Sequence, residues 1–442
     1  MPNSLVQLAT LVLLLALSAP ARAQDNPVVV VTPGSARSFK AAVQTFADRS
    51  VLADSQRVVR LRDEVARGLE YSNVFEALPM AAFLGPEATV SLDDDSVRCS
   101  DWSQIGADAL VQGSIAVDTE LRVEFRAWDT ARCKVVASKR YRQPKSSDLT
   151  ILAKRIADDV VEAFIGLRGV ASTELAFVSN RTGSSEVFVM GADGSHPRPA
   201  TSNRSINNFP SWSPDGDAIL YTSYRHQGRP LLFVSSRGRG RPGRLLPRLD
   251  GKGSEFRGVF SPLGGSLALV LSRPGHAADI YTVGVDGRKL RQLTGGGSIE
   301  VSPAWSPDGK RIAFVSDRGG SPQIYLMDAD GSNQRRLSYQ GNYNTHPAWS
   351  PDGSWIAYES RVGGQFDIWL IDPEGTVNLP IVSHPRGDEA PCWAPNGRKL
   401  AFSSKRRGRA DIYVVDIGGE NLRRITQGAG DNTAPSWGPF PR

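Results

Sequence analysis

The chain has 442 residues, more than one ordinary domain, and this length indicates two or three domains. Charged residues make up 22% and hydrophobic residues 40% of the chain, close to the average of globular proteins, which argues against extensive disorder. The net charge of +6 is mild and does not match the dense basic surface of a nucleic-acid-binding protein.

The first 23 residues have the pattern of a cleavable secretory signal. Residues 5–17 are almost wholly apolar, but a run of about 13 is too short to span a bilayer, which takes about 20. Ala21-Arg22-Ala23 supplies an A-x-A cleavage pattern, so the mature chain is expected to begin at Gln24. The alternative is a buried strand or helix, because Met1–Ser4 carries no Lys or Arg. No Cys follows the cleavage site, which excludes a lipid anchor there, and no later stretch is long enough to span a membrane.

Residues 24–165 predict a small α/β domain. Val58, Leu61, Val65 and Leu69 recur at helical spacing, and a second amphipathic pattern fills residues 149–165, so two helices are expected. Strands are expected at residues 28–32, 40–46, 109–117, 121–128 and 134–141. A domain of roughly 140 residues is of common size. Residues 166–173 are the expected linker to the rest of the chain.

The three cysteines have different expected roles. Cys99 and Cys133 lie in the α/β region and could form a disulfide in an oxidising compartment, or they could remain two unpaired thiols. Cys392 stands before Trp393, where other repeats carry Ala or Ser. It is therefore predicted to be a small buried residue and not a nucleophile.

A repeat fills residues 174–442. The segment Trp212-Ser-Pro-Asp-Gly recurs with substitutions at intervals of 44 to 48 residues. A period of about 40–45 residues with a Trp and a turn signature is typical of a β-propeller blade. The 43 Gly and 29 Pro of the chain fit its many turns. The first residue of each repeated segment is called its anchor, and the anchors are Trp212, Phe260, Trp305, Trp349, Trp393 and Trp437.

The repeats predict a six-bladed ring that closes on itself. In one repeat, an inner strand ends at Trp349, a Pro-Asp-Gly turn follows, and three further strands complete a four-stranded blade. The last inner strand, 434–437, has no successor, and the first second strand, 175–179, has no inner strand before it. Their pairing would remove exposed sheet edges. The second strands are expected at 175–179, 218–223, 266–271, 311–316, 355–360 and 399–404.

Polar residues precede every inner strand, where we expect them to ring one mouth of the central channel. Five residues before the anchors stand Asn207, Glu255, Glu300, Asn344, Asp388 and Asn432. Four before stand Asn208, Phe256, Val301, Thr345, Glu389 and Thr433, and three before stand Phe209, Arg257, Ser302, His346, Ala390 and Ala434. Phe209, Phe256 and Tyr343 add aromatic side chains that a partner could contact, so this rim suits a protein partner. Asn and Asp also cap turns by bonding nearby backbone groups, so a purely structural role is the alternative for each.

Catalysis is the competing hypothesis for the same channel. Calcium takes 6–8 oxygen ligands, so Glu255, Glu300, Asn344 and Asp388 could hold a cation in a metal-dependent propeller hydrolase. A propeller can also be the lid of a serine peptidase, but the chain has no G-x-S-x-G and ends just after the closing strand. The sequence also lacks H-E-x-x-H, C-x-x-C and a phosphate-binding Gly-rich loop. We therefore predict a protein that is not an enzyme and has no cofactor.

Two basic runs fall in expected hairpin loops. They are Arg237, Arg239, Arg241 and Arg244, and Lys405, Arg406, Arg407 and Arg409. Solvated loops are the favoured interpretation. Few aromatic residues are interleaved with them, which fits nucleic acid poorly.

The repeat and the domain layout resemble the TolB family. The pattern P-x-W-S-P-D-G-x-x-I-A-F/Y stands here as Pro303–Phe314 and as Pro347–Tyr358. The α/β region carries Ile105-Gly-Ala-Asp-Ala-Leu-Val-Gln-Gly113. A signal peptide, a small α/β domain and a six-bladed propeller are similar to that family over essentially the whole mature chain. The third blade departs from the pattern, with Gly258 for Pro, Phe260 for Trp and Leu263 for Asp.

The resemblance implies a periplasmic, non-enzymatic component of the Tol-Pal envelope system that supports outer-membrane integrity and envelope constriction at cell division. It implies that the propeller mouth receives the peptidoglycan-associated lipoprotein Pal. It also implies that the mature N-terminal segment 24–31 contacts TolA, with Gln24, Asp25, Asn26, Val28 and Val29 as candidate contact residues. Outer-membrane proteins are further candidate partners, whereas nucleic acid is not, and the mature chain is not expected to span a membrane.

Overall fold

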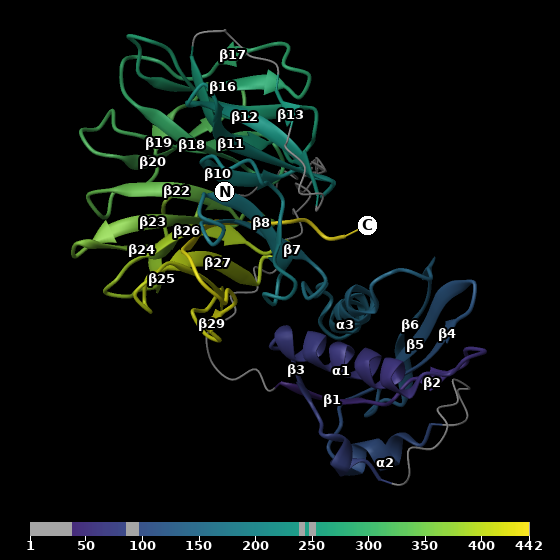
Figure 1. Ribbon diagram of the computed structural model, residues 1–442. Coiled ribbons are helices and arrows are strands. Elements are labelled where there is room, and N and C mark those ends of the chain that lie inside the picture. Colours follow the sequence, from purple (N-terminus) through teal and green to yellow (C-terminus); the bar gives the residue numbers. More distant parts are fainter. Residues whose placement is uncertain (1–37, 85–96, 238–243, 247–252, 442) are drawn as a thin grey trace, which may run out of the picture. The chain divides into compact units, whose positions relative to one another are not determined.

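The computed structural model describes residues 38–84, 97–237, 244–246 and 253–441 (Figure 1). The predicted signal peptide, the predicted strand at 28–32 and the segment 24–31 lie outside the described residues. In the part of the chain that is described, no helix is long and apolar enough to cross a membrane.

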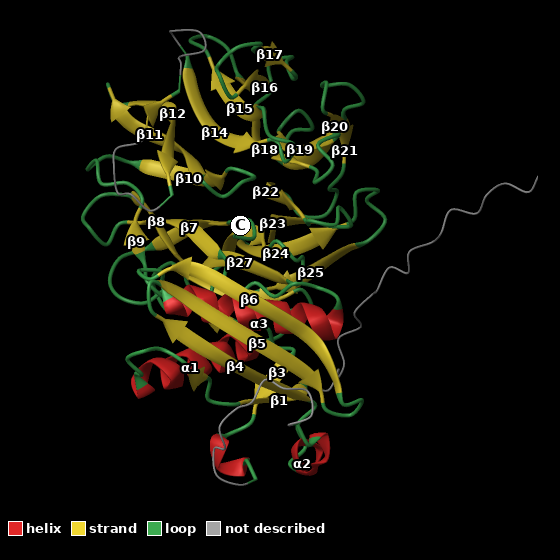
Figure 2. Ribbon diagram, turned by 90° about the vertical axis from the view of Figure 1, so that its right-hand side faces the viewer, coloured by secondary structure: helices red, strands yellow, loops and turns green. Residues whose placement is uncertain are grey.

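The α/β domain is one mixed sheet with two long helices on a single face. The sheet order is β3-β1-β4-β5-β6, with β2 paired to β4, and β1 runs parallel to both its neighbours. Figure 2 shows helices α1 and α3 together behind β4, β5 and β6. The strands are β1 (Phe39–Val43), β2 (Ala47–Asp48), β3 (Phe75–Ala77), β4 (Ala109–Val117), β5 (Glu120–Asp129) and β6 (Lys134–Pro144). The helices are α1 (Ser55–Tyr71), α2 (Cys99–Gln104), α3 (Leu149–Ile165) and a 3₁₀ turn at Met80–Ala82.

The long helices form because apolar residues line one side and acidic residues cap the first turns. Asp54 accepts hydrogen bonds from the backbone N–H of Gln56 and Arg57, and Asp148 accepts one from Thr150. These bonds satisfy amide groups that have no partner inside the helix. Leu61 of α1 and Ile156 of α3 are fully buried in one core with the apolar residues of β4 and β5. The two predicted helices are thus confirmed.

A disulfide joins Cys99 at the start of α2 to Cys133 in the turn between β5 and β6. The sequence had left the disulfide and two free thiols as equal alternatives. The predicted strand 40–46 is interrupted, because β1 ends at Val43 and β2 begins at Ala47. Neither α2 nor β3 was predicted, since six and three residues are too few to show a period.

The propeller has six blades, each a sheet of four antiparallel strands, as predicted. Inner strands are β10 (Asn207–Trp212), β14 (Ser254–Phe260), β18 (Glu300–Trp305), β22 (Asn344–Trp349), β26 (Asp388–Trp393) and β30 (Asn432–Trp437). Second strands are β7 (Glu174–Ser179), β11 (Ala218–His226), β15 (Ser266–Ser272), β19 (Arg311–Ser316), β23 (Ile356–Val362) and β27 (Lys399–Ser404). Third strands are β8 (Glu186–Gly191), β12 (Arg229–Ser236), β16 (Ala278–Gly284), β20 (Gln323–Asp328), β24 (Gln365–Ile371) and β28 (Asp411–Asp416). Fourth strands are β9 (Arg198–Pro199), β13 (Arg244–Leu245), β17 (Arg291–Gln292), β21 (Arg335–Arg336), β25 (Asn378–Val382) and β29 (Arg423–Arg424).

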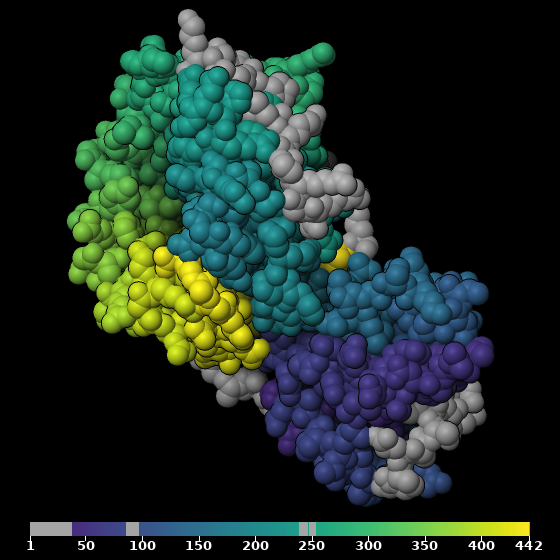
Figure 3. All heavy atoms as spheres, in the orientation of Figure 1, coloured from purple at the N-terminus to yellow at the C-terminus, as the bar shows by residue number. Residues whose placement is uncertain are grey.

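The ring closes by pairing the last strand with the first, so blade 1 is β30-β7-β8-β9 and blades 2 to 6 follow in chain order from β10. Asn432 lies opposite Ser179 and Trp437 opposite Leu175 in this antiparallel pair. In Figure 3 the yellow C-terminal residues lie against the teal residues that begin the propeller. The predicted closure is confirmed, and it leaves β7 with a partner on each side.

Helix α3 also holds the segment that leads into the propeller. The buried Asp158 carboxylate accepts hydrogen bonds from Ala171 N at 2.8 Å, Ser172 N at 2.9 Å and Ser172 Oγ at 2.5 Å. Residues 170–173 are themselves buried, so no water replaces this acceptor. The segment expected to be a linker is therefore fixed to the helix before it.

We expect Asp158→Ala to lower the free energy of unfolding by at least about 2 kcal/mol, because it leaves buried donors without an acceptor. The measurement is urea unfolding followed by far-ultraviolet circular dichroism. Glu162→Ala is the matched control, since Glu162 lies on the same helix and is exposed. Equal stability of the two variants would contradict the role of Asp158.

Candidate partner-binding site

The central channel is lined by one irregular position from every inner strand. Each inner strand shifts register against its second strand after its second or third residue, as between Asn208 and Ser211. A cavity of about 180 Å³ lies among these positions. The six residues at the shift all have φ between 48° and 55°, and they are Phe209, Arg257, Ser302, His346, Ala390 and Ala434. They are the residues that stand three before the anchors, so all six blades contribute to the cavity wall.

A proline follows the shifted residue in five blades, and Gly258 replaces it in blade 3. Proline is tolerated at such a bulge because its missing N–H is not needed for the ladder. At Gly258 a Cβ atom would lie 2.8 Å from Leu220 Cδ2 and 2.9 Å from Leu232 Cδ1. The glycine of the third blade therefore stands where the inner strand lies in close contact with blade 2.

The polar residues that stand five before the anchors are buried, with exposed fractions of 0–1%. The side chains of the three asparagines among them tie their inner strands to the third strand of the preceding blade. Asn207 donates to Glu186 Oε2 at 3.0 Å, Asn344 donates to Gln323 Oε1 at 2.6 Å, and Asn432 donates to Asp411 Oδ1 at 3.2 Å. The expectation that this set offers free side chains at the mouth is corrected: Asn207, Glu255, Glu300, Asn344, Asp388 and Asn432 lie inside the blades. Thr345, predicted beside them, is buried as well.

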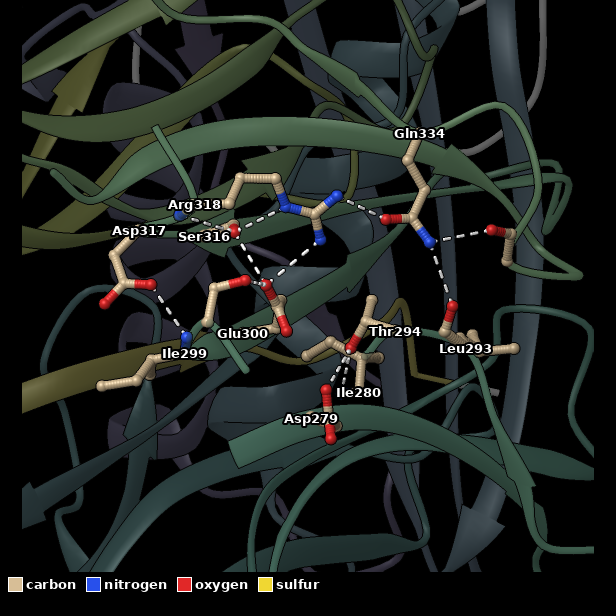
Figure 4. A network of polar contacts seen from close by, with 12 residues as sticks. Asp279, Ile280, Leu293, Thr294, Ile299, Glu300, Ser316, Asp317, Arg318 and Gln334 are labelled. Carbon is tan, nitrogen blue, oxygen red and sulfur yellow. Dashed lines mark hydrogen bonds and ion pairs between the residues drawn. The ribbon is translucent and has the colours of Figure 1, made fainter. Parts of the chain in front are cut away.

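We call the polar contacts around the first residues of an inner strand, where it meets the preceding blade, a joint. Figure 4 shows the joint between blades 3 and 4. Glu300 accepts hydrogen bonds from Ser298 Oγ at 2.7 Å, Ser316 Oγ at 2.8 Å and Arg318 at 3.1 Å. Asp279 of blade 3 faces Glu300, whereas Asn207 and Asn432 each pair an amide with an acid. Burial, and after it the neighbouring Glu300, raises the pKa of Asp279. This joint therefore favours a proton on Asp279, because two adjacent carboxylates cannot both ionise without repulsion.

An arginine completes the joint in three blades, and the sequence reasoning missed its role. Arg181, Arg318 and Arg406 each donate to the serine that ends or nearly ends the second strand and to the buried residue that begins the inner strand. Each also lies over aromatic rings of its own blade, as Arg406 does over Tyr413 at 4.7 Å from the ring centre. The regular spacing of Arg two residues after a second-strand Ser was the available signal.

The accessible part of the mouth consists of other predicted residues and of several that were not predicted. Asn208, Phe209, Arg257, His346, Glu389 and Thr433 are half-buried, as are Phe256 and Val301, which also pack against blade cores. Exposed apolar side chains stand in the loops around them. We call this set the mouth patch, and its exposed fractions are Ile206 50%, Ile299 50%, Tyr339 72%, Tyr343 39% and Val362 41%. Such exposed apolar groups around a polar channel are typical of a protein-binding surface.

One acid of the channel wall was missed because it lies on a second strand. Glu359 of β23 is buried, and its Oε1 lies 2.8 Å from His346 Nδ1 and accepts a hydrogen bond from Ala390 N at 2.5 Å. Burial acts to raise the pKa of Glu359, but the charge and hydrogen bond of His346 outweigh it, and the pKa is lowered. Glu359 therefore stays ionised and holds the His346 ring in place.

Comparison with known proteins shows matches to two family models. Residues 27–136 match the TolB amino-terminal domain and residues 247–441 match the TolB beta propeller domain. The Tol-Pal system protein TolB of Anaeromyxobacter dehalogenans strain 2CP-1 is 37% identical over 305 residues, which are 67% of this chain and 67% of that one. The chain belongs to the TolB family.

Other comparisons agree with this assignment. A protein TolB homolog of Chlorobium chlorochromatii is 30% identical over 304 residues, 68% of this chain and 66% of that one. The crystal structure of TolB from Acinetobacter baumannii has a TM-score of 0.76 and covers 91% of this chain and 97% of that chain at 23% identity. That likeness shows a common fold.

The oxygen atoms of the alternative metal site do not converge in this TolB-family chain. Glu300, Asn344 and Asp388 are each bonded within a different blade joint. Among the residues that the structure describes, no group of three or more His, Cys, Asp and Glu could hold a metal ion. Cys392 lines the channel cavity and is half-buried, where full burial was expected. Burial raises the pKa of its thiol to about 12, which leaves it uncharged and a poor nucleophile.

Three of the four residues of the second basic run form ion pairs with acidic residues of blade 6. Arg406 pairs with Asp388 at 2.7 Å, Arg409 with Asp411 at 3.6 Å and Lys405 with Glu389 at 3.7 Å. In the first run Arg237 pairs with Glu174 at 2.6 Å. Arg239 and Arg241 lie outside the described residues, and so does the side chain of Arg244.

Arg406→Ala is expected to lower the free energy of unfolding by about 3–5 kcal/mol, because Asp388 would keep a buried charge without its partner. Arg407→Ala, in the same run but exposed, should change it by less than about 0.5 kcal/mol. Urea unfolding of both variants and wild type measures the difference. A loss confined to Arg407→Ala, or none in either, would contradict the joint described above.

Proposed function

We propose that this chain is a periplasmic, non-enzymatic scaffold of the Tol-Pal system that binds the lipoprotein Pal at the propeller mouth. Membership of the TolB family supports the system. The observation that carries the binding site is the mouth patch, because its apolar side chains are exposed around a channel whose polar frame makes its hydrogen bonds within the blades. Tyrosine is frequent among the hot spots of protein interfaces, and Tyr339 and Tyr343 are both exposed in the mouth patch.

TolA is the second proposed partner, and segment 24–31 is its proposed contact. The support is the family assignment together with the position of this segment directly after the expected signal cleavage site. Through the two partners the protein would connect the inner and outer membranes, which accounts for the proposed roles in outer-membrane integrity and in constriction at division. Outer-membrane proteins remain further proposed partners of the same scaffold.

Titration calorimetry of the mature chain, from Gln24, with the periplasmic domain of Pal from the same organism tests this proposal. We expect a dissociation constant of about 1 μM or tighter. Tyr343→Ala should weaken binding about 30-fold, since a central aromatic contact contributes about 2 kcal/mol.

Leu263→Ala is the matched control for the calorimetry. Leu263 is 75% exposed and lies in the turn between β14 and β15, at the end of the blade opposite to the mouth loops. Its truncation should leave the affinity within about 2-fold, as for a surface residue outside the interface. No binding by folded wild type would contradict the Pal proposal, and equal losses in the two variants would contradict the placement of the interface. Charge reversal at Glu300 or Asp388 is unsuitable, because both are buried and the change would test folding.

A further inference from the structure

Arg257 is a cation inside the channel without an ion-pair partner among the described residues. It comes from blade 3, the blade in which Gly258 replaces the proline of the repeat. Its Nη1 donates to Ser302 Oγ at 2.6 Å, and its guanidinium lies over the Phe209 ring at 4.0 Å from the ring centre. Burial lowers its pKa to about 10, against an ordinary value above 12. A neutral hydroxyl and one ring face thus leave most of its donors without an anionic acceptor.

The acid that acts on Arg257 from a distance is already used. Glu359 and Tyr343 influence its charge through space. Glu359 Oε1, however, lies against His346 Nδ1 and accepts from Ala390 N, and no ion pair joins it to Arg257 in the described part of the chain. A half-buried arginine whose charge is partly withdrawn from water is held in such a site at a cost in free energy unless an anion joins it.

The cavity beside Arg257 admits one small group. Its volume is about 180 Å³, the space of about six water molecules at ~30 Å³ each. Apart from Arg257 and His346 its lining is mostly proline, alanine, valine and serine. A charged group entering it would be removed from water, and only a group that matches a guanidinium could bind there favourably. A carboxylate is such a group, because it accepts two parallel hydrogen bonds from one arginine.

We propose that the channel of this protein contains a carboxylate site, in which Arg257, Phe209 and Ser302 receive the side chain of an aspartate or glutamate of the protein that docks on the mouth. This inference rests on the proposed function for its occupant, but the site itself is defined by the chain's own residues. A protein is the favoured source because the mouth patch surrounds the opening with exposed apolar side chains, which a free carboxylate would leave uncovered.

If Arg257 serves a partner and not the fold, its removal should not lower the thermal stability of the free protein. Arg257→Met keeps an unbranched apolar chain for packing over Phe209 and removes a buried charge that lacks an ionic partner. Replacement of such a charge by an apolar group is commonly neutral or stabilising. We therefore expect a thermal unfolding midpoint that is unchanged or higher than that of wild type. A clear decrease would show that Arg257 serves the fold, and it would overturn the proposal.

The binding test uses the full mature chain and the periplasmic domain of Pal. Arg257→Met should weaken binding at least about 30-fold, as for one partner of a desolvated charge pair. Arg288→Met is the control, since Arg288 is exposed in the turn between β16 and β17, at the end of the blade opposite to the mouth loops, and it should change affinity less than 3-fold. Each aspartate and glutamate of the Pal domain is then changed to its amide. One amide variant should lose as much as Arg257→Met and show no further loss with it. If none does, Arg257 acts through packing and the proposal fails.

A second probe separates this inference from the proposed function. N-acetylglutamate methylamide carries one side-chain carboxylate, and N-acetylglutamine methylamide is its neutral match. Only the former should give a saturable shift of the Arg257 Nε–Hε signal in nitrogen-15 spectra, assigned by its absence in Arg257→Met. A shift without Pal binding would contradict Pal as the partner and keep the carboxylate site. Absence of a shift, with Pal binding unaffected by Arg257→Met, would overturn the site and leave the Pal proposal standing.

Discussion

A buried polar side chain at the first or second residue of each inner strand is the constraint on which the rest of the propeller depends. Each inner strand pairs only with the second strand of its own blade, so its other side needs an attachment to the neighbouring blade. Bonds such as that from Asn344 to Gln323 supply it. Because an unsatisfied buried polar group costs about 1–3 kcal/mol, each bond also fixes the register between blades. Asn432 also accepts a hydrogen bond from Ser179 Oγ at 2.8 Å across the closing pair of β30 and β7, where chain connectivity gives no help.

These joints divide the residues before the anchors by function. The residues five before the anchors form the frame, and the ones three before adopt the left-handed conformation and face the cavity. The frame satisfies its own charges, as Arg406 does for Asp388. Arg257 is different because its neighbours are a hydroxyl and a ring. In the part of the chain that the structure describes, the mouth is thus a polar frame around Arg257, a cation without an ion-pair partner.

Much of the fold could be predicted because the signals repeat. Six copies of a Trp-and-turn segment at nearly constant spacing define the blades, and the two unpaired ends define the closure. Helices α1 and α3 carry enough turns to show their period. The short elements α2 and β3 depend instead on a disulfide and on pairing with β1, which a local pattern does not contain.

The site could be predicted only in outline. The position of Asn, Asp and Glu before each inner strand located the mouth, but the sequence could not separate buried from exposed members. The adjacent blade decides whether a side chain before an inner strand is buried. Glu359 reaches the channel from β23, the second strand of blade 5, and not from a position before an anchor. The exposed Ile206, Ile299 and Tyr343 each stand six residues before an anchor, but Ser254, Gly387 and Asp431 hold the same position in the other repeats, so the spacing alone did not reveal an apolar patch.

Hydrogen–deuterium exchange of the mature chain with and without the Pal periplasmic domain tests the central claim most directly. The account predicts slower exchange in the loops that lead into the inner strands, residues 203–209, 295–301 and 339–346, when the partner is bound. Exchange should be unchanged in the turns at the other end of the blades, residues 213–217 and 350–354. Protection of these turns with no change in the mouth loops would contradict the account.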